Sequence, residues 1–264
     1  MRTTCGPGLA LEPIPILGDN YVWAVDDGAR AVVVDPGDAG PVQAWLERRA
    51  LVLSAILVTH HHADHIGGLA DLRAAWPRAT LIGPDDARIA LLDRVVGDGD
   101  RVELAAPALA LEVIAVPGHT RSHIAFHGAG LLFCGDMLFS AGCGRLFEGS
   151  PAQMLASLDR LADLPGSTLV CCTHEYTAAN CAFARRVEPD NADLTGFCEQ
   201  VLALRADDLP TLPSSLGRER SINPFLRIDQ AAVRATLAAR GLPEDASRSE
   251  AFAVLRSWKD GFRA

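Results

Sequence analysis

The chain's most distinctive chemistry lies in the segment His60-His61-His62-Ala63-Asp64-His65. The segment follows the apolar run Ala55–Val58, which is typical of a buried strand. Imidazole nitrogens bind zinc, iron and nickel, and a neighbouring carboxylate adds a harder, negatively charged ligand. The alternative interpretation, a histidine-rich surface loop, does not explain the further ligand-type residues elsewhere in the chain. The segment therefore predicts a metal site.

Three further ligand-type side chains, those of His119, Asp136 and His174, each follow an apolar, strand-like run and one or two small residues. Binding sites on layered scaffolds gather on the loops at one end of the strands. A single histidine after a strand is more often structural, but three such recurrences beside the first cluster indicate one shared site. The predicted ligands are His60, His62, Asp64, His65, His119, Asp136 and His174.

Seven ligands are too many for one catalytic zinc ion, which takes three from the protein. Two divalent ions roughly 3.5–4 Å apart, with one carboxylate shared between them, use the set economically. Such a pair holds a bridging hydroxide, because the pKa of the bound water falls to about 7. The set thus indicates metal-assisted hydrolysis without a serine or cysteine nucleophile. Zinc is the expected metal, and iron and manganese suit the same ligands.

Length and composition restrict the classes of protein that remain. The chain has 264 residues, 49% of them hydrophobic and 22% charged, as is ordinary for a globular protein. A formal net charge of −9 argues against a nucleic-acid partner. Seven cysteines without a C-x-x-C pair favour a reducing compartment. With neither a signal peptide nor an apolar run near ~18 residues, we expect a cytoplasmic protein with no membrane partner.

Short strand-like runs recur through the first two thirds of the chain, several of them without a helix between them. They are Tyr21–Val25, Ala31–Asp35, Ala55–Thr59, Thr80–Ile82, Leu111–Val116, His123–His127, Leu131–Cys134 and Thr168–Cys172. Helical patterns cover Pro41–Arg49, Gly68–Trp76 and Pro151–Leu164, and Ser150 is a good cap for the last. This order favours a sandwich of mixed sheets over a single doubly wound sheet.

The character of the sequence changes after Thr173. Residues 177–206 are alanine-rich and helix-like, and Leu209–Pro224 is a proline-rich loop by composition. Asp229–Arg240 has a helical pattern, and the Ser247-x-x-Glu250 capping box opens a final helix. We therefore predict a second, mostly helical domain.

The H-x-H-x-D-H motif with its remote His, Asp and His resembles the metallo-β-lactamase superfamily, whose fold is a four-layer αββα sandwich. Three stretches, Gly135–Gly149, Thr173–Thr177 and Asn223–Phe225, look more narrowly like glyoxalase II, the hydroxyacylglutathione hydrolases. The resemblance runs from Asp19-Asn20-Tyr21 to Arg256-x-x-Lys259-Asp260. It implies an α+β fold with a metallo-β-lactamase-like catalytic domain over residues 1–174 and a helical, glutathione-binding domain over residues 175–264.

The resemblance also implies a reaction: hydrolysis of the thioester S-D-lactoylglutathione to glutathione and D-lactate, a step of methylglyoxal detoxification. One ion would be bound by His60, His62 and His119, and the other by Asp64, His65 and His174. Asp136 would bridge the two ions. We expect Asp64 and Asp136 to be the catalytic carboxylates, Asp64 also accepting a proton from the bridging water. We expect the chain to act as a monomer.

Cations near the C-terminus are the predicted substrate contacts. Arg256 and Lys259 are three residues apart on the last predicted helix and therefore share a face. Composition alone favours the other interpretation, a solvated helix end at which cations interact favourably with the helix dipole. The resemblance makes them binders of the glutathione carboxylates, with Arg145, Phe147 and Tyr176 as further contacts.

Some positions depart from the family pattern. Phe147 stands where many relatives have Tyr, Met137 where Thr is common, and Ser122 where Gly is usual. None of them removes a metal ligand, so they bear on substrate affinity more than on reaction type. We assign no role to His61, and we expect His123 and His127 to be structural.

Two other functions compete with this hypothesis. One is another enzyme of the superfamily, such as a persulfide dioxygenase or a lactonase. The other is a non-catalytic protein with a structural metal, but structural zinc sites usually have four Cys or His ligands. One metal ion per chain, with no thioesterase activity after reconstitution, would favour these alternatives.

Overall fold

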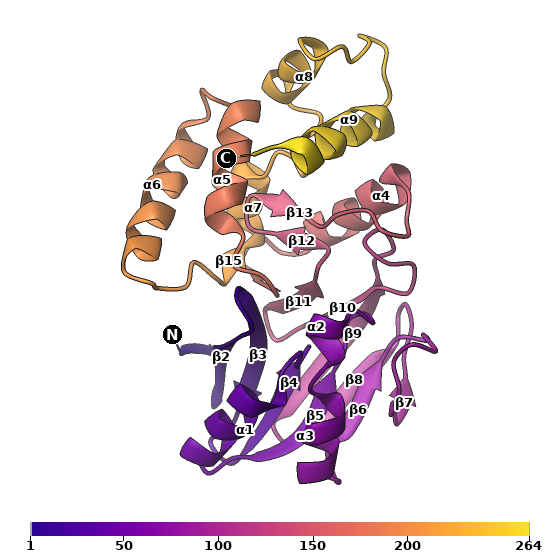
Figure 1. Cartoon of the computed structure of the whole chain (residues 1–264), viewed down its shortest axis with the longest axis vertical. Helices are drawn as coiled ribbons and strands as arrows, with labels where there is room; N and C mark the ends of the chain where they lie inside the picture. Colours follow the sequence, from indigo (N-terminus) through magenta and orange to yellow (C-terminus); the bar gives the residue numbers. More distant parts are fainter. Residues whose placement is uncertain (1, 264) are drawn as a thin grey trace. The chain divides into compact units, whose positions relative to one another are not determined.

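The computed structural model describes residues 2–263 (Figure 1). The chain forms two compact units that interleave along the sequence. Unit 1 takes in the chain up to Ala115 together with Ser122–Gly135 and Cys171–His174. Unit 2 takes in Val116–Arg121, Asp136–Val170 and the chain from Glu175 onward. The domain division at residue 174 is a different partition of the chain and stays a prediction.

A seven-stranded mixed sheet lies in unit 1, with its strands in sequence order from β1 to β7. The strands are β1 (Thr3–Gly6), β2 (Leu9–Ile16), β3 (Asn20–Asp26), β4 (Arg30–Val34), β5 (Val52–Leu57), β6 (Thr80–Gly83) and β7 (Arg94–Val95). Neighbours from β1 to β4 are antiparallel, and those from β4 to β7 are parallel. Because parallel strands end at the same edge, the loops after β4, β5 and β6 emerge together there.

Helices α1 (Ala39–Arg48) and α3 (Leu69–Ala75) pack on this sheet. Trp45 and Leu72 share one hydrophobic cluster with strand residues such as Ile56. Burial of these apolar side chains is what holds the helices in place. Between β5 and α3 lies the short helix α2 (Ala63–Ile66), which carries part of the predicted ligand segment.

The second sheet has the order β15-β14-β11-β10-β9-β8, and β12 and β13 form a separate two-stranded ribbon. The strands are β8 (Arg101–Ala105), β9 (Ala108–Ala115), β10 (Ile124–Gly128), β11 (Leu131–Gly135), β12 (Leu138–Phe139), β13 (Gly142–Cys143), β14 (Leu169–Cys172) and β15 (Ser214–Ser215). Buried and exposed residues alternate along most of β9, as expected for a strand with one solvated face. The prediction of two sheets, instead of one doubly wound sheet, is confirmed.

The remaining helices belong to unit 2. They are α4 (Pro151–Ala162), α5 (Thr177–Val187), α6 (Ala192–Ala206), α7 (Leu216–Ile222), α8 (Ala231–Ala238) and α9 (Arg248–Gly261). Both predicted helix starts are confirmed: Ser150 and Ser247 each form a full capping box, with Gln153 and Glu250. Among residues 2–263, no helix is both long enough and apolar enough to cross a bilayer.

Some predicted elements were wrong. The stretch Leu209–Pro224 was expected to be a loop, but it contains β15 and α7, the latter capped by the Ser215 side chain. The helix-like pattern over residues 177–206, in contrast, is confirmed, and it forms two helices, α5 and α6. Strand β2 was not predicted because Pro13 and Pro15 interrupt its pattern, and proline in a sheet is tolerated only where no ladder hydrogen bond is needed.

Candidate active site

The predicted ligand segment begins at the edge of the first sheet, directly after β5. Thr59 donates two hydrogen bonds to the Asp35 carboxylate beyond the end of β4, from its backbone N–H (2.8 Å) and from its hydroxyl (2.7 Å). Since the single hydroxyl hydrogen goes to Asp35, the 3.1 Å contact between Thr59 Oγ1 and His60 Nδ1 has the imidazole as donor. The lone pair of His60 is then on Nε2, the nitrogen that faces His62.

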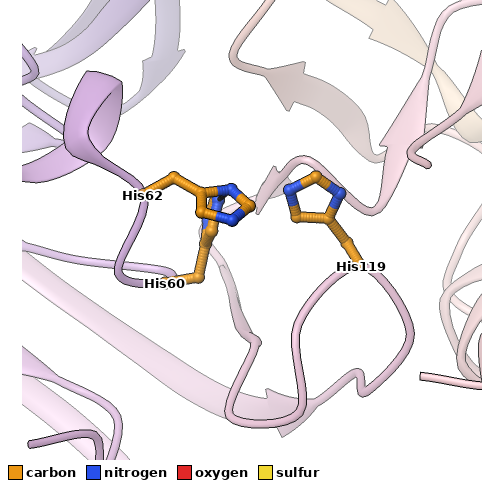
Figure 2. Close-up of side chains that lie close together, drawn as sticks. All are labelled: His60, His62 and His119. Atoms are coloured by element: carbon orange, nitrogen blue, oxygen red, sulfur yellow. Dashed lines mark hydrogen bonds between the residues drawn. The ribbon is translucent and has the colours of Figure 1, made fainter. Parts of the chain in front are cut away.

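His60, His62 and His119 form one group of ligand atoms (Figure 2). Nε2 of His60 lies 3.1 Å from Nδ1 of His62, and the three ligand nitrogens all lie within 4.8 Å of one another. The close-up shows the three rings directed toward a common space. Three convergent imidazoles are the ligand type and number that a catalytic zinc ion takes from a protein.

A second group consists of Asp64, His65 and His174. Oδ2 of Asp64 lies 3.6 Å from Nε2 of His65 and 3.4 Å from Nε2 of His174. A third group, His60, His65 and Asp136, overlaps the first two in its histidines. All seven predicted ligands therefore fall into these three groups.

In three of the ligand histidines Nδ1 lies close to an oxygen acceptor, and in His119 and His174 this contact is a hydrogen bond. Nδ1 of His65 lies 3.0 Å from Asp35 Oδ2, and Nδ1 of His174 lies 2.8 Å from Asp19 Oδ1. Nδ1 of His119 lies 2.9 Å from the carbonyl oxygen of Arg145. Carboxylates and carbonyls accept, so Nδ1 of His119 and of His174 carries the hydrogen, and the Nε2 atoms of both rings present their lone pairs. Metal-binding histidines are usually held in this way, and the donor set therefore fits a metal centre.

Two glycines let the backbone pass close to predicted ligands. A Cβ atom at Gly37 would lie 1.8 Å from the carbonyl oxygen of Asp64, and one at Gly144 would lie 1.9 Å from that of Asp136. Both neighbours are backbone atoms, which cannot swing aside as a flexible side chain would. Only glycine fits at these positions without displacing the ligand-bearing segments.

A pocket of ≈ 510 Å³ opens in unit 2 beside two of the predicted ligands. It is lined by His119, Asp136, all five predicted substrate contacts (Arg145, Phe147, Tyr176, Arg256 and Lys259), and by Phe139, Cys143, Ala179, Asn180 and Phe262. A concave site with several cations and aromatic rings next to candidate metal ligands suits an anionic small molecule.

The cations of the pocket differ in their surroundings. Arg256 is 3% exposed and donates from Nη1 to the carbonyl oxygen of Cys143 (2.8 Å) and from Nη2 to Asp260 (3.0 Å). Burial, together with the nearby charge of Arg256, lowers the pKa of Lys259 to about 8. Arg145 is exposed. Lys259 and Arg145 are therefore the accessible cations of the pocket, whereas Arg256 is buried and its hydrogen bonds stabilise the pocket wall.

Other side chains around the ligands were not singled out from the sequence. Asp19 and Asp35 orient ligand histidines, and Asn20 donates to Oδ2 of Asp64 (3.0 Å). Asp19 and Asn20 stand at the start of the family resemblance, which was their only signal. His123 is buried and stacks on His60 with the ring centroids 4.6 Å apart, as suits a structural residue.

Two protein-family models together match residues 16–262 of the chain. The metallo-beta-lactamase superfamily model matches residues 16–174, and the model described as hydroxyacylglutathione hydrolase C-terminus matches residues 175–262. The first match alone covers more than half of the chain.

Individual relatives agree with these matches. The hydroxyacylglutathione hydrolase of Cupriavidus taiwanensis is 52% identical, over 97% of this chain and 100% of its own. That of Xanthomonas axonopodis pv. citri is also 52% identical with the same coverage. The crystal structure of ETHE1 from Myxococcus xanthus aligns with a TM-score of 0.64 and 25% identity, over 94% of this chain and 99% of its own. The chain belongs to the hydroxyacylglutathione hydrolases of the metallo-beta-lactamase superfamily.

Proposed function

We propose that the protein hydrolyses S-2-hydroxyacylglutathione thioesters, with S-D-lactoylglutathione as the substrate and glutathione and D-lactate as the products. The observation that carries the proposal is the pocket in which Arg145 and Lys259 lie together with the predicted ligands His119 and Asp136. It provides cations for an anionic thiol carrier and ligand-type groups for the reacting carbonyl. This reaction would place the protein in methylglyoxal detoxification.

Two divalent ions, zinc most readily, are the cofactors we propose. His60, His62 and His119 would hold one ion, and Asp64, His65 and His174 the other, with Asp136 between them. When bound, the ions supply Lewis acidity toward the thioester carbonyl and lower the pKa of coordinated water to about 7. The convergence of the ligand atoms into groups within 4.8 Å supports this assignment.

The chain's own residues then orient the reactants and move a proton. Asn20 donates to Oδ2 of Asp64, and this hydrogen bond fixes the carboxylate that we propose accepts a proton from the attacking water. His119 and Asp136 line the pocket and lie 3.4 Å apart (Nε2 to Oδ2), so the thioester carbonyl would approach beside them. The leaving thiol has an ordinary pKa near 8.5 and departs as the thiolate without a strong general acid.

Recognition of the thiol carrier falls to the rest of the pocket. Glutathione carries two carboxylates, and the proposed direct partners are Lys259 and Arg145. Arg256 would add its charge from the buried side while holding the carbonyl of Cys143. The rings of Phe147 and Tyr176 line the same pocket and offer apolar surface to the peptide. The proposed contacts are thus electrostatic at the substrate carboxylates and apolar along the rest of the glutathione peptide.

The remaining features of the account are proposals as well. We propose a domain division between residues 174 and 175, where the two family matches meet. We also propose a cytoplasmic monomer with no nucleic-acid partner, in keeping with the net charge of −9.

A comparison of two thioesters tests the function. Hydrolysis of S-D-lactoylglutathione is measured beside that of an acyl-coenzyme A, for the wild type, for Lys259→Ala and for the control Arg186→Ala. Arg186 is exposed on α5 and is not among the residues that line the pocket. We expect a strong preference for the glutathione thioester and a KM that rises about 10- to 100-fold in Lys259→Ala alone, because a hydrogen-bonded charge contact is lost. Equal rates for both thioesters, unchanged in Lys259→Ala, would contradict the proposal.

A further inference from the structure

His61 and Ser122 have no part in the proposed reaction, yet both contact the same carboxylate. Oδ2 of Asp86 lies 3.4 Å from Nδ1 of His61 and accepts a 2.5 Å hydrogen bond from the hydroxyl of Ser122. The Asp86 side chain is 5% exposed. Burying a carboxylate costs free energy unless it is fully hydrogen-bonded, so the groups that contact Asp86 help to stabilise the loop that carries it.

The topology of the first sheet brings Asp86 to this place. Asp86 lies three residues after β6, which pairs in parallel with β5. The loop after β5 carries the ligand segment His60–His65. Parallel neighbours deliver these two loops to the same edge of the sheet, so the carboxylate reaches a residue 25 positions earlier in the chain.

Asp86 is itself held firmly. The guanidinium of Arg88 donates two hydrogen bonds of 2.8 Å each to the carboxylate, one from Nε to Oδ1 and one from Nη2 to Oδ2. The backbone N–H of Arg88 adds a third bond to Oδ1 (3.0 Å). These bonds, those of the Arg88 side chain first, hold the pKa of Asp86 well below its usual range. The carboxylate is therefore an ionised acceptor with a fixed orientation.

His61 and Ser122, which both contact Asp86, adjoin the predicted metal ligands in different ways. His61 lies between His60 and His62 in the chain, so holding its ring restrains the backbone of both ligands. Ser122 precedes His123, whose ring stacks on His60 with centroids 4.6 Å apart and an interplanar angle of 17°. One carboxylate thus supports the His60 imidazole through the chain and through a ring stack.

We propose that Asp86 is a positioning residue for the metal centre: through His61 and Ser122 it keeps the imidazoles of His60 and His62 in the geometry that binds a metal ion. This inference rests on the proposed function, because it needs a metal at His60 and His62.

The test measures metal affinity on the full chain, using zinc in competition with a chromophoric chelator. The variants are Asp86→Asn, which removes the negative charge next to His61 and Ser122, and Ser122→Ala, which removes a single hydroxyl. The control is Asp85→Asn, which changes the exposed neighbouring residue. We expect the zinc dissociation constant to rise about 10- to 100-fold in Asp86→Asn, as for other groups that orient metal ligands. It rises about threefold to tenfold in Ser122→Ala, and it stays at the wild-type value in the control.

A second readout separates positioning from general stability. The visible spectrum of the cobalt(II)-loaded protein reports ligand geometry, and it shifts in Asp86→Asn but not in Asp85→Asn. KM at saturating zinc stays at the wild-type value in Asp86→Asn and in Asp85→Asn, since neither residue lines the pocket.

The outcomes are distinct. A wild type that binds no zinc or leaves S-D-lactoylglutathione intact rejects the proposed function. If the wild type does both while natively folded Asp86→Asn keeps its zinc affinity and cobalt spectrum, only the role of Asp86 is rejected. Should Asp86→Asn fail to fold, Ser122→Ala decides, and an unchanged zinc affinity in that variant overturns the inference.

Discussion

Lys259 is the only lysine of the chain, and it lies in the pocket proposed to bind the substrate. Burial lowers its pKa to about 8, so the side chain is cationic below that pH and becomes neutral above it. A neutral amine no longer attracts a substrate carboxylate. We therefore expect KM for S-D-lactoylglutathione to rise as the pH passes through about 8, while both substrate carboxylates stay ionised.

Lys259→Arg provides the control, because an arginine stays charged over the whole range. Its KM should be flat where that of the wild type rises, when both are measured between about pH 6 and about pH 10. The same pH dependence in both proteins would assign the effect to another group. The single lysine also allows a chemical check: acetylation by an amine-selective reagent should be slowed by substrate at this side chain.

Asp64 is the residue for which ligation and proton transfer are hardest to separate. Its Oδ2 lies 3.4 Å from Nε2 of His174 and accepts from Asn20. Asp64→Asn keeps an oxygen ligand but loses the basicity, so we expect kcat to fall about 100-fold or more at saturating zinc. Turnover and metal content are measured on the same sample. Normal turnover with full metal content would remove Asp64 from the role of proton acceptor.

At the scale of elements, the site depends on how closely the loops after β4 and β5 approach each other. Gly37 follows β4, and a Cβ there would meet the backbone carbonyl of Asp64 at 1.8 Å. We predict that Gly37→Ala displaces α2 and weakens zinc binding at Asp64 and His65 by more than about tenfold.

Gly40→Ala is the matched control. Its Cβ would lie 3.5 Å from the Asp38 side chain, an ordinary contact, and alanine favours the helix α1 by up to about 1 kcal/mol. Thermal melting and zinc affinity are measured for both variants. Equal zinc affinity in Gly37→Ala and Gly40→Ala would show that this close approach does not position the ligands.

Whether a residue of the site could be predicted from the sequence depends on the helix, strand or loop that carries it. The ligands His60 to His65 share one short motif, and His119, Asp136 and His174 each follow a recognisable strand. The carboxylates that contact histidines around the site, those of Asp19, Asp35 and Asp86, carry no comparable local signal. Each of these carboxylates comes close to its histidine only through strand pairing or through the order of strands in a sheet. A local sequence pattern shows neither of these.

The same reason accounts for the elements that were missed. Helix α7 is bounded by Pro213 and Pro224, so its stretch has the composition of a loop. Tertiary hydrogen bonds stabilise it: Glu219 on α7 is fully buried and accepts from the Ala141 backbone N–H (2.8 Å) and the Ser140 hydroxyl (3.0 Å). These are tertiary contacts with the β12–β13 ribbon, and tertiary contacts override local propensity.

At the scale of the whole molecule, metal binding should contribute to folding. Ligands that bind only the native state stabilise it by about 4 kcal/mol at a free concentration 1,000 times the dissociation constant. For a chain of this size such a difference corresponds to a shift in Tm of about 10 °C. We expect chelation to lower Tm by roughly this amount and zinc to restore it, as followed by circular dichroism. A Tm that is unchanged by chelation would mean that the ligand groups do not hold a metal in the native state.

The proposed function requires that these seven side chains hold two metal ions that serve thioester hydrolysis. Titrating the metal-free protein with zinc while following S-D-lactoylglutathione hydrolysis tests it most directly. We expect activity to reach its maximum at two equivalents of zinc per chain. Full activity at one equivalent, or no activity at two, would contradict it.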